Sequence, residues 1–368
     1  MKPRIGFALE QALGHVAYGM SLKRALAARS DFDAVWMDIP FTPGLFGHIP
    51  VIGKNWTVRG SARAWRAIAR AHRIKPLDAL FIHTQTIGLL SGGLMSKIPT
   101  MLSLDATPRN YDELAAWYGD KVHSAPVERA KLLVHRTVMR RARCFTTWSE
   151  WAKASLVADY GADPALITVL HPGTTLSNFP DPKTRGPRRP GPTRLLFVGG
   201  DFLRKGGDML LDVFRRHLSA SCELHLVTSA EVEPGGGVHV YRGVKPHAPE
   251  LLRLYADSDV FVLPTRGDCL AVVLGEAMAS SLPIVTTRVG AHAEAVVEGE
   301  SGFVIDVDDA DALRDRLERL ARDPELARKM GRRSREVGEQ RFDMDRNANR
   351  IADLLLAMCP AAERHSRS

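Results

Sequence analysis

A glycine-rich turn with two adjacent cations is the first stretch whose residue types could do chemistry. Its members follow the apolar run Arg194–Val198 in the order Gly199, Gly200, Arg204, Lys205, Gly206 and Gly207. Glycines let a backbone approach a ligand closely, and the start of the helix that follows attracts anions. The Lys205 ammonium could therefore meet a phosphate. The spacing also fits a plain strand–turn–helix unit with solvated cations, since it matches neither a Walker A loop nor G-x-G-x-x-G.

Two acidic residues eight positions apart mark a second such stretch. Asp268 and Glu276 follow the apolar run Val260–Leu263, and we expect Glu276 to open a helix over Glu276–Ser280. Open parallel sheets bind ligands in the crevice at the carboxyl ends of their strands, where both acids are expected. A carboxylate buried there accepts two hydrogen bonds from a cis-diol such as ribose. The alternative is that Glu276 only caps its helix, where an acid is favoured.

Short apolar runs must position these residues. The expected strands are Arg4–Leu9, Ala34–Met37, Ala79–Ile82, Thr100–Leu104, Cys144–Thr147, Arg194–Val198, Glu223–Val227, Val238–Tyr241, Val260–Leu263 and Pro283–Thr286. Helical patterns separate most of them, beginning with one near Ala17–Arg29. Strands that alternate with helices imply parallel sheets covered on both faces. The fold class is therefore α/β, with two Rossmann-like, doubly wound parallel-sheet domains.

A proline-rich stretch provides the domain boundary. Residues 181–192 read DPKTRGPRRPGP and are almost free of apolar side chains, which is typical of a stiff linker. We therefore assign 1–180 to an N-terminal domain and 193–343 to a C-terminal domain. A helix over 344–358 is expected to complete the first domain.

Composition excludes several classes of protein. Of 368 residues, 45% are hydrophobic and 25% are charged, which excludes a mainly disordered chain, a collagen and a coiled coil. The four cysteines are scattered, so neither a disulfide framework nor a four-cysteine zinc site is expected. No apolar run reaches the roughly 18 residues of a membrane-spanning helix. The N-terminal apolar stretch is shorter than a secretory signal, so we expect a cytoplasmic protein.

Positive charge is concentrated in the first half of the chain. Residues 1–180 carry 22 Lys and Arg against 13 Asp and Glu, whereas residues 181–368 carry 28 against 29. Two helical stretches contribute basic side chains, Arg59, Arg63, Arg66, Arg70 and Arg73 beside Trp56 and Trp65, and Arg129, Arg136, Arg140, Arg141 and Arg143. A solvated helix face explains such runs, and peripheral contact with an anionic membrane is the alternative. No basic motif interleaved with aromatic residues favours nucleic acid.

Together the two glycine-and-acid stretches resemble the retaining glycosyltransferases of family 4, also called group 1, which have the GT-B fold. The matching elements are Gly199 through Lys205 and Gly206, the pair Asp268 and Glu276, the loop 290–294, and the crossing HPGTTLSNF at 171–179. The resemblance covers nearly the whole chain. It departs from the family pattern at Gly200, where an arginine is frequent, at Asp268, where glutamate is usual, and at Ala271 and Ser281, where glycine is usual.

The resemblance implies roles for residues of the C-terminal domain. Lys205 and Arg204 would hold the donor diphosphate, Asp268 would contact sugar hydroxyls, and Glu276 would bind the ribose hydroxyls. The remaining donor-binding positions would be Gly199, Gly200, Gly243, Val244, Cys269, Leu270 and Ala271. No DxD-type acidic pair or histidine cluster is expected to offer a metal site, so no cofactor is expected beyond the sugar nucleotide as substrate.

The resemblance also places residues of the N-terminal domain. Gly14 and His15 follow the first strand, where the family has a glycine loop near the donor phosphate and the acceptor. Asp105 stands where the family usually has a histidine beside the donor sugar, and His83 is expected to face the cleft. A turn cap at Asp105 and a structural histidine at His83 are the alternatives.

These features lead us to expect a cytoplasmic, metal-independent, retaining hexosyltransferase that uses a nucleoside diphosphate sugar and a glycan or lipid-linked acceptor. Cell-envelope or exopolysaccharide biosynthesis is the expected context, with possible peripheral contact with the membrane. The alternatives are a GT-B sugar-nucleotide epimerase and a non-catalytic sugar-nucleotide-binding protein. The nucleobase, the sugar, the acceptor and the linkage stay open.

Overall fold

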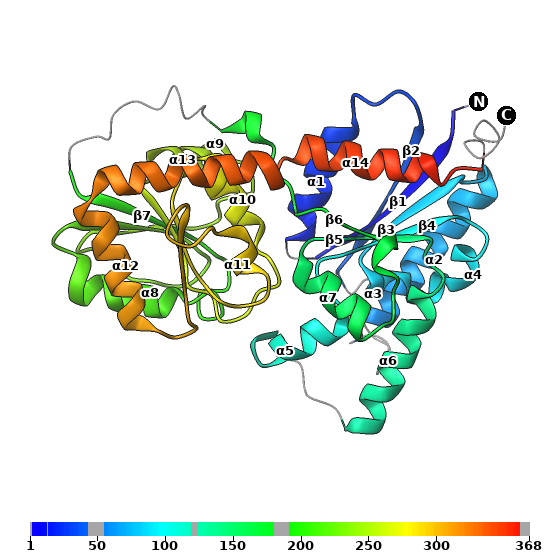
Figure 1. The fold of residues 1–368 in the computed structure, drawn as a ribbon, viewed down its shortest axis with the longest axis horizontal. Helices are drawn as coiled ribbons and strands as arrows, with labels where there is room; N and C mark the ends of the chain where they lie inside the picture. Colours follow the sequence, from blue (N-terminus) through cyan, green and yellow to red (C-terminus); the bar gives the residue numbers. More distant parts are fainter. Residues whose placement is uncertain (1, 13, 43–54, 119–123, 180–190, 361–368) are drawn as a thin grey trace. The chain divides into compact units, whose positions relative to one another are not determined.

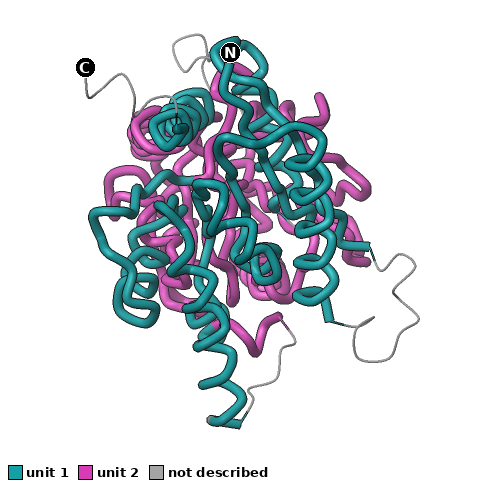
Figure 2. The backbone as a smooth tube through the Cα atoms, turned by 90° about the vertical axis from the view of Figure 1, so that its right-hand side faces the viewer, with its two compact units in different colours: residues 1–113, 121–171, 344–368 teal, residues 114–120, 172–343 magenta. Residues whose placement is uncertain are grey.

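The chain forms two compact units (Figures 1 and 2). The computed structural model describes residues 2–12, 14–42, 55–118, 124–179 and 191–360. Unit 1 comprises Met1–Glu113, Lys121–His171 and Met344–Ser368, and unit 2 comprises Leu114–Asp120 and Pro172–Asp343. The chain thus enters unit 2 after His171, earlier than expected, and residues 181–190 of the expected linker lie outside the described residues.

Unit 1 is built on a six-stranded parallel sheet. Its strands are β1 (Arg4–Gln11), β2 (Asp33–Pro40), β3 (Ala79–His83), β4 (Thr100–Leu104), β5 (Cys144–Thr147) and β6 (Ile167–Val169). They lie in the order β2-β1-β3-β4-β5-β6, so the direction of winding reverses between β1 and β3. Every residue of β3 and β4 is buried, which explains why their sequences, ALFIH and TMLSL, are mostly apolar.

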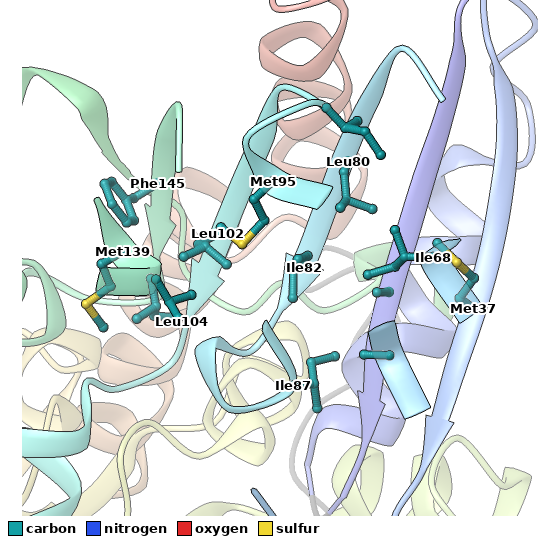
Figure 3. Packing of buried hydrophobic residues seen from close by; sticks show 14 of the residues in the cluster. Met37, Ile68, Leu80, Ile82, Ile87, Met95, Leu102, Leu104, Met139 and Phe145 are labelled. Atoms are coloured by element: carbon teal, nitrogen blue, oxygen red, sulfur yellow. The ribbon is translucent and has the colours of Figure 1, made fainter. Parts of the chain in front are cut away.

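Helices cover the sheet of unit 1. They are α1 (His15–Leu26), α2 (Trp56–Ile74), α3 (Gln85–Gly88), η2 (Leu89–Ser91), α4 (Gly92–Met95), α5 (Pro108–Tyr118, whose end belongs to unit 2), α6 (Ala125–Met139), α7 (Glu150–Ala158), η3 (Pro164–Leu166) and α14 (Met344–Ala357). The side chains of Leu80, Ile82 and Leu102 pack with Ile68 of α2 and Met139 of α6 (Figure 3). Arg29, shortly after the end of α1, donates hydrogen bonds to Asn349 and Asp353 of α14, which joins the C-terminal helix to this unit.

Unit 2 contains a second six-stranded parallel sheet. Its strands are β7 (Thr193–Val198), β8 (Cys222–Val227), β9 (Val238–Tyr241), β10 (Val260–Leu263), β11 (Ile284–Thr287) and β12 (Gly302–Ile305). The order β12-β11-β10-β7-β8-β9 places the reversal between β7 and β10. The segments that follow β7 and β10 therefore meet at one edge of the sheet, where ligands bind in such folds.

The helices of unit 2 are η4 (Leu176–Asn178), α8 (Gly207–Val213) continued by the π-helical turn η5 (Phe214–Leu218), α9 (Pro249–Asp257), α10 (Val272–Ala279), α11 (His292–Ala295), α12 (Ala310–Arg322) and α13 (Pro324–Arg341). Two of them, α12 and α13, begin at aspartate caps. Asp309 accepts a hydrogen bond from the Ala312 amide and Asp323 accepts one from the Leu326 amide. Aspartate is favoured at this position because it satisfies an amide that the first helical turn leaves open.

All ten expected strands are present, which confirms the α/β fold class. Two strands were not predicted, namely β6 with three residues and β12 with four. The helix expected at Glu276–Ser280 was placed wrongly, because α10 begins at Val272 and ends at Ala279. The four cysteines are free, in agreement with the absence of a disulfide framework. No described helix is long and apolar enough to cross a membrane.

Candidate functional site

The loops after β7 and β10 touch at the point where the winding of unit 2 reverses. The Arg266 amide donates a hydrogen bond of 2.8 Å to the Arg204 carbonyl. Gly206 has a φ of +73°, and a Cβ there would lie 2.0 Å from the Pro264 carbonyl oxygen. Glycine is therefore required at Gly206, since any side chain would push the two loops apart. This close approach brings the predicted cations and the first predicted acid together.

Lys205 and Asp268 form an ion pair between the two loops. His292 of α11 lies 3.8 Å from the same carboxylate, and its Nδ1 is 2.9 Å from the Thr286 hydroxyl. Burial alone would raise the pKa of Asp268, but Lys205, His292 and Arg204 together hold it below its ordinary value. Burial lowers the pKa of His292 to about 4, so its imidazole is neutral near pH 7. The loop edge thus presents an ionised carboxylate with a bound ammonium.

Arg204 is largely engaged by protein groups. Its Nε donates to Asp201 at 3.0 Å and its Nη1 donates to the Gly267 carbonyl at 2.6 Å. The guanidinium also lies 4.8 Å from the centre of the Tyr118 ring, which adds a cation–π contact. Only 9% of the residue is exposed. Arg204 therefore ties the two loops together and adds positive potential. Among the described hydrogen bonds, the Lys205 ammonium donates to one partner, the carboxylate of Asp268.

Glu276 lies in the middle of α10 and is 4% exposed. The interpretation as a helix cap is therefore wrong, because the helix begins four residues earlier at Val272. The Tyr255 hydroxyl of α9 donates a hydrogen bond of 2.8 Å to Glu276 Oε2. Burial raises the pKa of Glu276 from 4.5 to about 7, and the bond from Tyr255 only partly opposes the rise. A carboxyl kept inside a helix at this cost points to a ligand that stabilises its charge.

The other predicted donor-binding positions are spread over three loops of unit 2. Gly199 is buried against the Lys205 stem, and Gly200 is exposed. Cys269, Leu270 and Ala271 are buried beside Asp268. The Ala271 amide donates to His292 Nε2 at 3.3 Å, so this segment holds the imidazole. Gly243 and Val244 follow β9, and Gly243 is exposed with a φ of +71°.

A second polar group is buried in unit 1. His15, the first residue of α1, places its Nε2 3.3 Å from Asp105 Oδ2, just after β4. Burial lowers the pKa of His15, but the charge and hydrogen bond of Asp105 outweigh it and raise the pKa above its ordinary value. Burial would raise the pKa of Asp105, whereas His15 and His83 hold it low. Asp105 is therefore an ionised carboxylate that is paired with His15.

His83 is fully buried at the end of β3. Its ring centre lies 4.8 Å from that of His15, 4.7 Å from that of Tyr18 and 5.2 Å from that of Trp148. Burial and the nearby His15 lower the pKa of His83 to about 3. The structure therefore favours a packing role for His83 beneath His15 over the expected contact with an acceptor. Gly14, by contrast, is exposed immediately before α1.

Three residues at these sites were not assigned from the sequence. Tyr255 holds Glu276, His292 faces Asp268, and Glu10 is buried at the end of β1. Glu10 accepts 2.5 Å and 2.6 Å hydrogen bonds from the side chains of Trp56 and Thr84. A glutamate that interrupts an apolar strand was the available signal for Glu10, but nothing local pairs Tyr255 with Glu276, which lies 21 positions away.

The basic helices differ from the expected solvated stripes. On α2, Arg59 is buried and Arg63 donates to the carbonyls of Pro40 and Thr42, so the five arginines do not form one exposed stripe. On α6, exposed apolar side chains accompany the exposed arginines. They are Val127, Leu133 and Val134, which are 48%, 62% and 53% exposed.

One group among the described residues could hold a metal ion. It consists of Glu223, His225 and His239, on β8 and β9, and it includes none of the residues at the β7–β10 edge. The β7–β10 edge instead presents the Lys205 ammonium beside the Asp268 carboxylate, groups that are able to bind an anion and hydroxyl groups.

Comparison with known proteins agrees with this arrangement. The family model described as Glycosyl transferases group 1 matches residues 192–323, which include the loops after β7 and β10. A D-inositol 3-phosphate glycosyltransferase of Pseudarthrobacter chlorophenolicus is 33% identical over 54% of this chain and 52% of its own length. The chain thus spans about half the length of that relative. A GDP-mannose-dependent alpha-(1-6)-phosphatidylinositol monomannoside mannosyltransferase of Mycolicibacterium smegmatis is 30% identical over 63% of this chain and 68% of its own length.

Solved structures share the fold of the whole chain. Sucrose-phosphate synthase of Thermosynechococcus elongatus aligns with a TM-score of 0.74 at 19% identity over 100% of both chains. HepE of Anabaena, solved with UDP and glucose, aligns with a TM-score of 0.70 at 15% identity over 96% of this chain and 100% of its own. These likenesses show the GT-B fold. The family model covers the strands and loops that carry Lys205, Asp268 and Glu276, and the mycobacterial relative is matched over two thirds of its length. The chain therefore belongs to the group 1 glycosyltransferases.

Proposed function

We propose that the protein is a retaining, metal-independent glycosyltransferase that moves a hexose from a nucleoside diphosphate sugar to a glycan or lipid-linked acceptor. The observation that carries the proposal is the ion pair of Lys205 and Asp268 between the loops after β7 and β10, together with the buried carboxyl of Glu276 in α10, the next helix along the chain. A diphosphate is bound by a cation, and the hydroxyl groups of a sugar and of a ribose are bound by carboxylates that accept hydrogen bonds. Lys205, Asp268 and Glu276 supply these three groups. Synthesis of cell-envelope or exported polysaccharide is the proposed context.

The contacts suggest how the work is divided within unit 2. Lys205 would bind the diphosphate and stabilise the charge that develops as the glycosidic bond breaks, in place of a metal ion. Asp268 would hold Lys205 from one side and accept hydrogen bonds from sugar hydroxyls. Because Arg204 is held by Asp201 and Gly267, we assign it to positioning the loops and to the positive potential. Glu276 would accept the ribose hydroxyls, with Tyr255 fixing one of its oxygens.

In unit 1, the buried carboxylate of Asp105 would stabilise positive charge at the anomeric carbon. His15 keeps this carboxylate ionised and oriented. Retention would follow from attack on the same face of the sugar that the diphosphate leaves, with a leaving phosphate oxygen taking the acceptor proton. The bond that breaks is the one between C1 and the phosphate oxygen, and the bond that forms joins C1 to the acceptor oxygen.

The names of the relatives narrow the substrates to be tried. The mycobacterial relative is named for GDP-mannose and a phosphatidylinositol mannoside, and the Pseudarthrobacter relative for inositol phosphate. A structural neighbour was solved with UDP-glucose. We therefore propose GDP and UDP sugars as donors to test first, with phosphorylated inositols and inositol lipids as acceptors.

Binding of nucleotides tests the proposal before the acceptor is known. UDP, GDP and ADP are added separately to the protein, and its melting temperature is measured, because a ligand that binds the native state raises it. We expect one diphosphate to raise it in the wild type and in Lys245→Ala, an exposed lysine of the same unit, and to have little effect on Lys205→Ala. If no diphosphate shifts the wild type, the proposal fails.

Transfer separates an enzyme from a protein that only binds sugar nucleotides. The protein is incubated with UDP-glucose or GDP-mannose and an inositol-containing acceptor, and release of the diphosphate is measured with and without the acceptor. Acceptor-dependent release supports transfer. Binding without release at any acceptor supports the non-catalytic alternative, and conversion of the donor into an isomeric sugar nucleotide supports an epimerase.

We also propose that α6 rests on an anionic membrane. Figure 1 shows its N-terminal half extending beyond the other helices of unit 1. Its exposed face combines Leu133 and Val134 with exposed Arg129 and Arg140. Apolar side chains with basic neighbours on one helix face suit a lipid surface.

Vesicles of phosphatidylcholine with increasing phosphatidylglycerol test this contact by co-sedimentation. We expect binding to rise with the anionic lipid and to fall with salt, since each Arg or Lys near such a surface contributes about 1 kcal/mol. The double variant Leu133→Gln, Val134→Gln should lose binding. Leu166→Gln removes an exposed leucine of η3 and should retain it. A wild type that stays in the supernatant at low salt would contradict the proposal and favour a water-soluble acceptor.

A further inference from the structure

Three potential metal ligands lie together on the strands β8 and β9 of unit 2. Glu223 and His225 are two positions apart on β8, and His239 is the direct neighbour of His225 in the register of β9. Residues two apart on a strand share a face of the sheet, and so do directly paired residues of neighbouring strands. One ligand atom from each of these three side chains lies within 4.8 Å of the others.

His225 is the buried member of the group. It is 9% exposed, and its ring is stacked on that of His239 with 4.8 Å between the ring centres. Its Nδ1 lies 3.0 Å from the Tyr241 hydroxyl, which can accept a hydrogen bond from Nδ1 and thereby leave the lone pair on Nε2. That Nε2 is buried, lies 3.6 Å from Glu223 Oε2, and has no hydrogen-bond partner among the described residues.

A buried nitrogen that lies 3.6 Å from a carboxylate oxygen and makes no hydrogen bond among the described residues needs an explanation. A buried polar atom without a hydrogen bond is costly, and few occur in folded proteins. The opposing contact is Arg194, whose Nε lies 3.3 Å from Glu223 Oε2. An ion at this position would have to compete with that guanidinium for the carboxylate.

The ligand types identify the class of ion. Two imidazoles and one carboxylate bind zinc and its transition-metal neighbours, whereas magnesium and calcium prefer oxygen ligands. Zn–N bonds of about 2.0 Å in a tetrahedron put ligand atoms about 3.3 Å apart. Reaching that spacing from 4.8 Å needs small side-chain rotations. His239 is exposed and Glu223 is half-buried, so both side chains have room to rotate while the backbone stays in place.

We propose that Glu223, His225 and His239 form a binding site for a divalent transition-metal ion, with Zn²⁺ as the first candidate and water as a fourth ligand. The ion would join the edge strand β9 to β8. It would stabilise unit 2 without taking part in sugar transfer, because the three ligands include none of the residues assigned to the donor. The site does not depend on the proposed function, since its ligands and its test are independent of any sugar nucleotide.

Calorimetric titration of the untagged, EDTA-treated and dialysed protein with Zn²⁺ tests the site. The variant His239→Ala removes an exposed ligand, so it should fold, and it should bind Zn²⁺ at least about tenfold more weakly than wild type. His217→Ala removes an exposed histidine of η5 outside the group and should bind as wild type does. Arg194→Gln should bind more tightly, because it releases the Glu223 carboxylate from its competitor.

Two further measurements make the test decisive. Zn²⁺ should raise the melting temperature of the wild type and of His217→Ala, but not that of His239→Ala. Co²⁺ in place of Zn²⁺ should give the visible absorption of a tetrahedral ion in the wild type and lose it in His239→Ala. Equal affinity of the wild type and His239→Ala for Zn²⁺, or no binding by the wild type, would overturn the proposal.

Discussion

Replacing Glu276 by glutamine should stabilise the ligand-free protein while weakening its affinity for nucleotide. Burial raises the pKa of Glu276 from 4.5 to about 7. Because one pKa unit corresponds to about 1.4 kcal/mol, this shift contributes about 3 kcal/mol to the pH dependence of the free energy of unfolding. The folded protein keeps the proton between these two pH values, while the unfolded chain has already lost it. The stabilising contribution is therefore fully present below pH 4.5 and is lost as pH rises through about 7.

Thermal unfolding of wild type and Glu276→Gln between pH 5 and pH 8.5 measures this contribution. The difference in melting temperature, variant minus wild type, should grow toward alkaline pH by about 6–12 °C, at about 2–4 °C for each kcal/mol in a unit of this size. Exposed Glu233→Gln should show no such growth. Parallel profiles for wild type and Glu276→Gln would refute the reasoning, because they would mean that Glu276 carries its charge at no cost.

Nucleotide binding completes this test. If the ionised carboxylate receives the ribose hydroxyls, affinity for the preferred diphosphate should fall by about tenfold for each pH unit below about 6. Binding at pH 6 should also release up to about one proton, which calorimetry in buffers of different ionisation enthalpy detects. Glu276→Gln should bind weakly at every pH. Unchanged affinity of this variant would assign Glu276 to the structure of α10 alone.

Four other outcomes are expected. Lys205→Ala should lower transfer by about 30- to 1000-fold without unfolding the protein, and a rate within twofold of wild type would remove Lys205 from the site. EDTA should leave transfer intact below the melting temperature, and full loss restored by Mn²⁺ or Mg²⁺ would contradict a metal-independent mechanism. Asp105→Asn should lower the pKa of His15, measured by NMR, since Asp105 raises it, and should reduce transfer. Ser281 has a φ of +56°, so Ser281→Gly should raise the free energy of unfolding by about 1 kcal/mol, and a lower melting temperature would show that its hydroxyl contributes more than the strain costs.

The strands could be predicted because their signal is local. A strand buried on both faces is mostly apolar, as the sequences of β3, β4 and β10 are. β6 was not predicted because its three residues are too few to distinguish a strand from a turn, and β12 because it begins at Gly302, a residue type that is depleted in strands. The start of α10 was misplaced because an apolar helix buried on all sides, such as Val272–Ala279, has no polar face to mark its first turn.

The part of the candidate site that the loops after β7 and β10 form was also predictable. Gly206, Lys205 and Asp268 could be placed together because parallel connectivity brings the ends of β7 and β10 to one edge. The hydrogen-bond partners and the burial of each side chain could not be derived in this way. The engagement of Arg204, the burial of His83 and that of Arg59 depend on side chains from distant segments, which no local pattern specifies.

The order of apolar runs, glycines and acids along the chain is enough to specify two α/β units, the family and the loops that carry its motif. These depend on short-range rules of backbone geometry and burial. Tertiary structure alone decided which charges are paired. It brought Tyr255 to Glu276, 21 positions along the chain, and His15 to Asp105, 90 positions along the chain. It also placed His239 beside His225, which lies 14 positions before it. Electrostatic energy depends on distance in space and on exclusion of water, and folding sets both only after distant strands have paired.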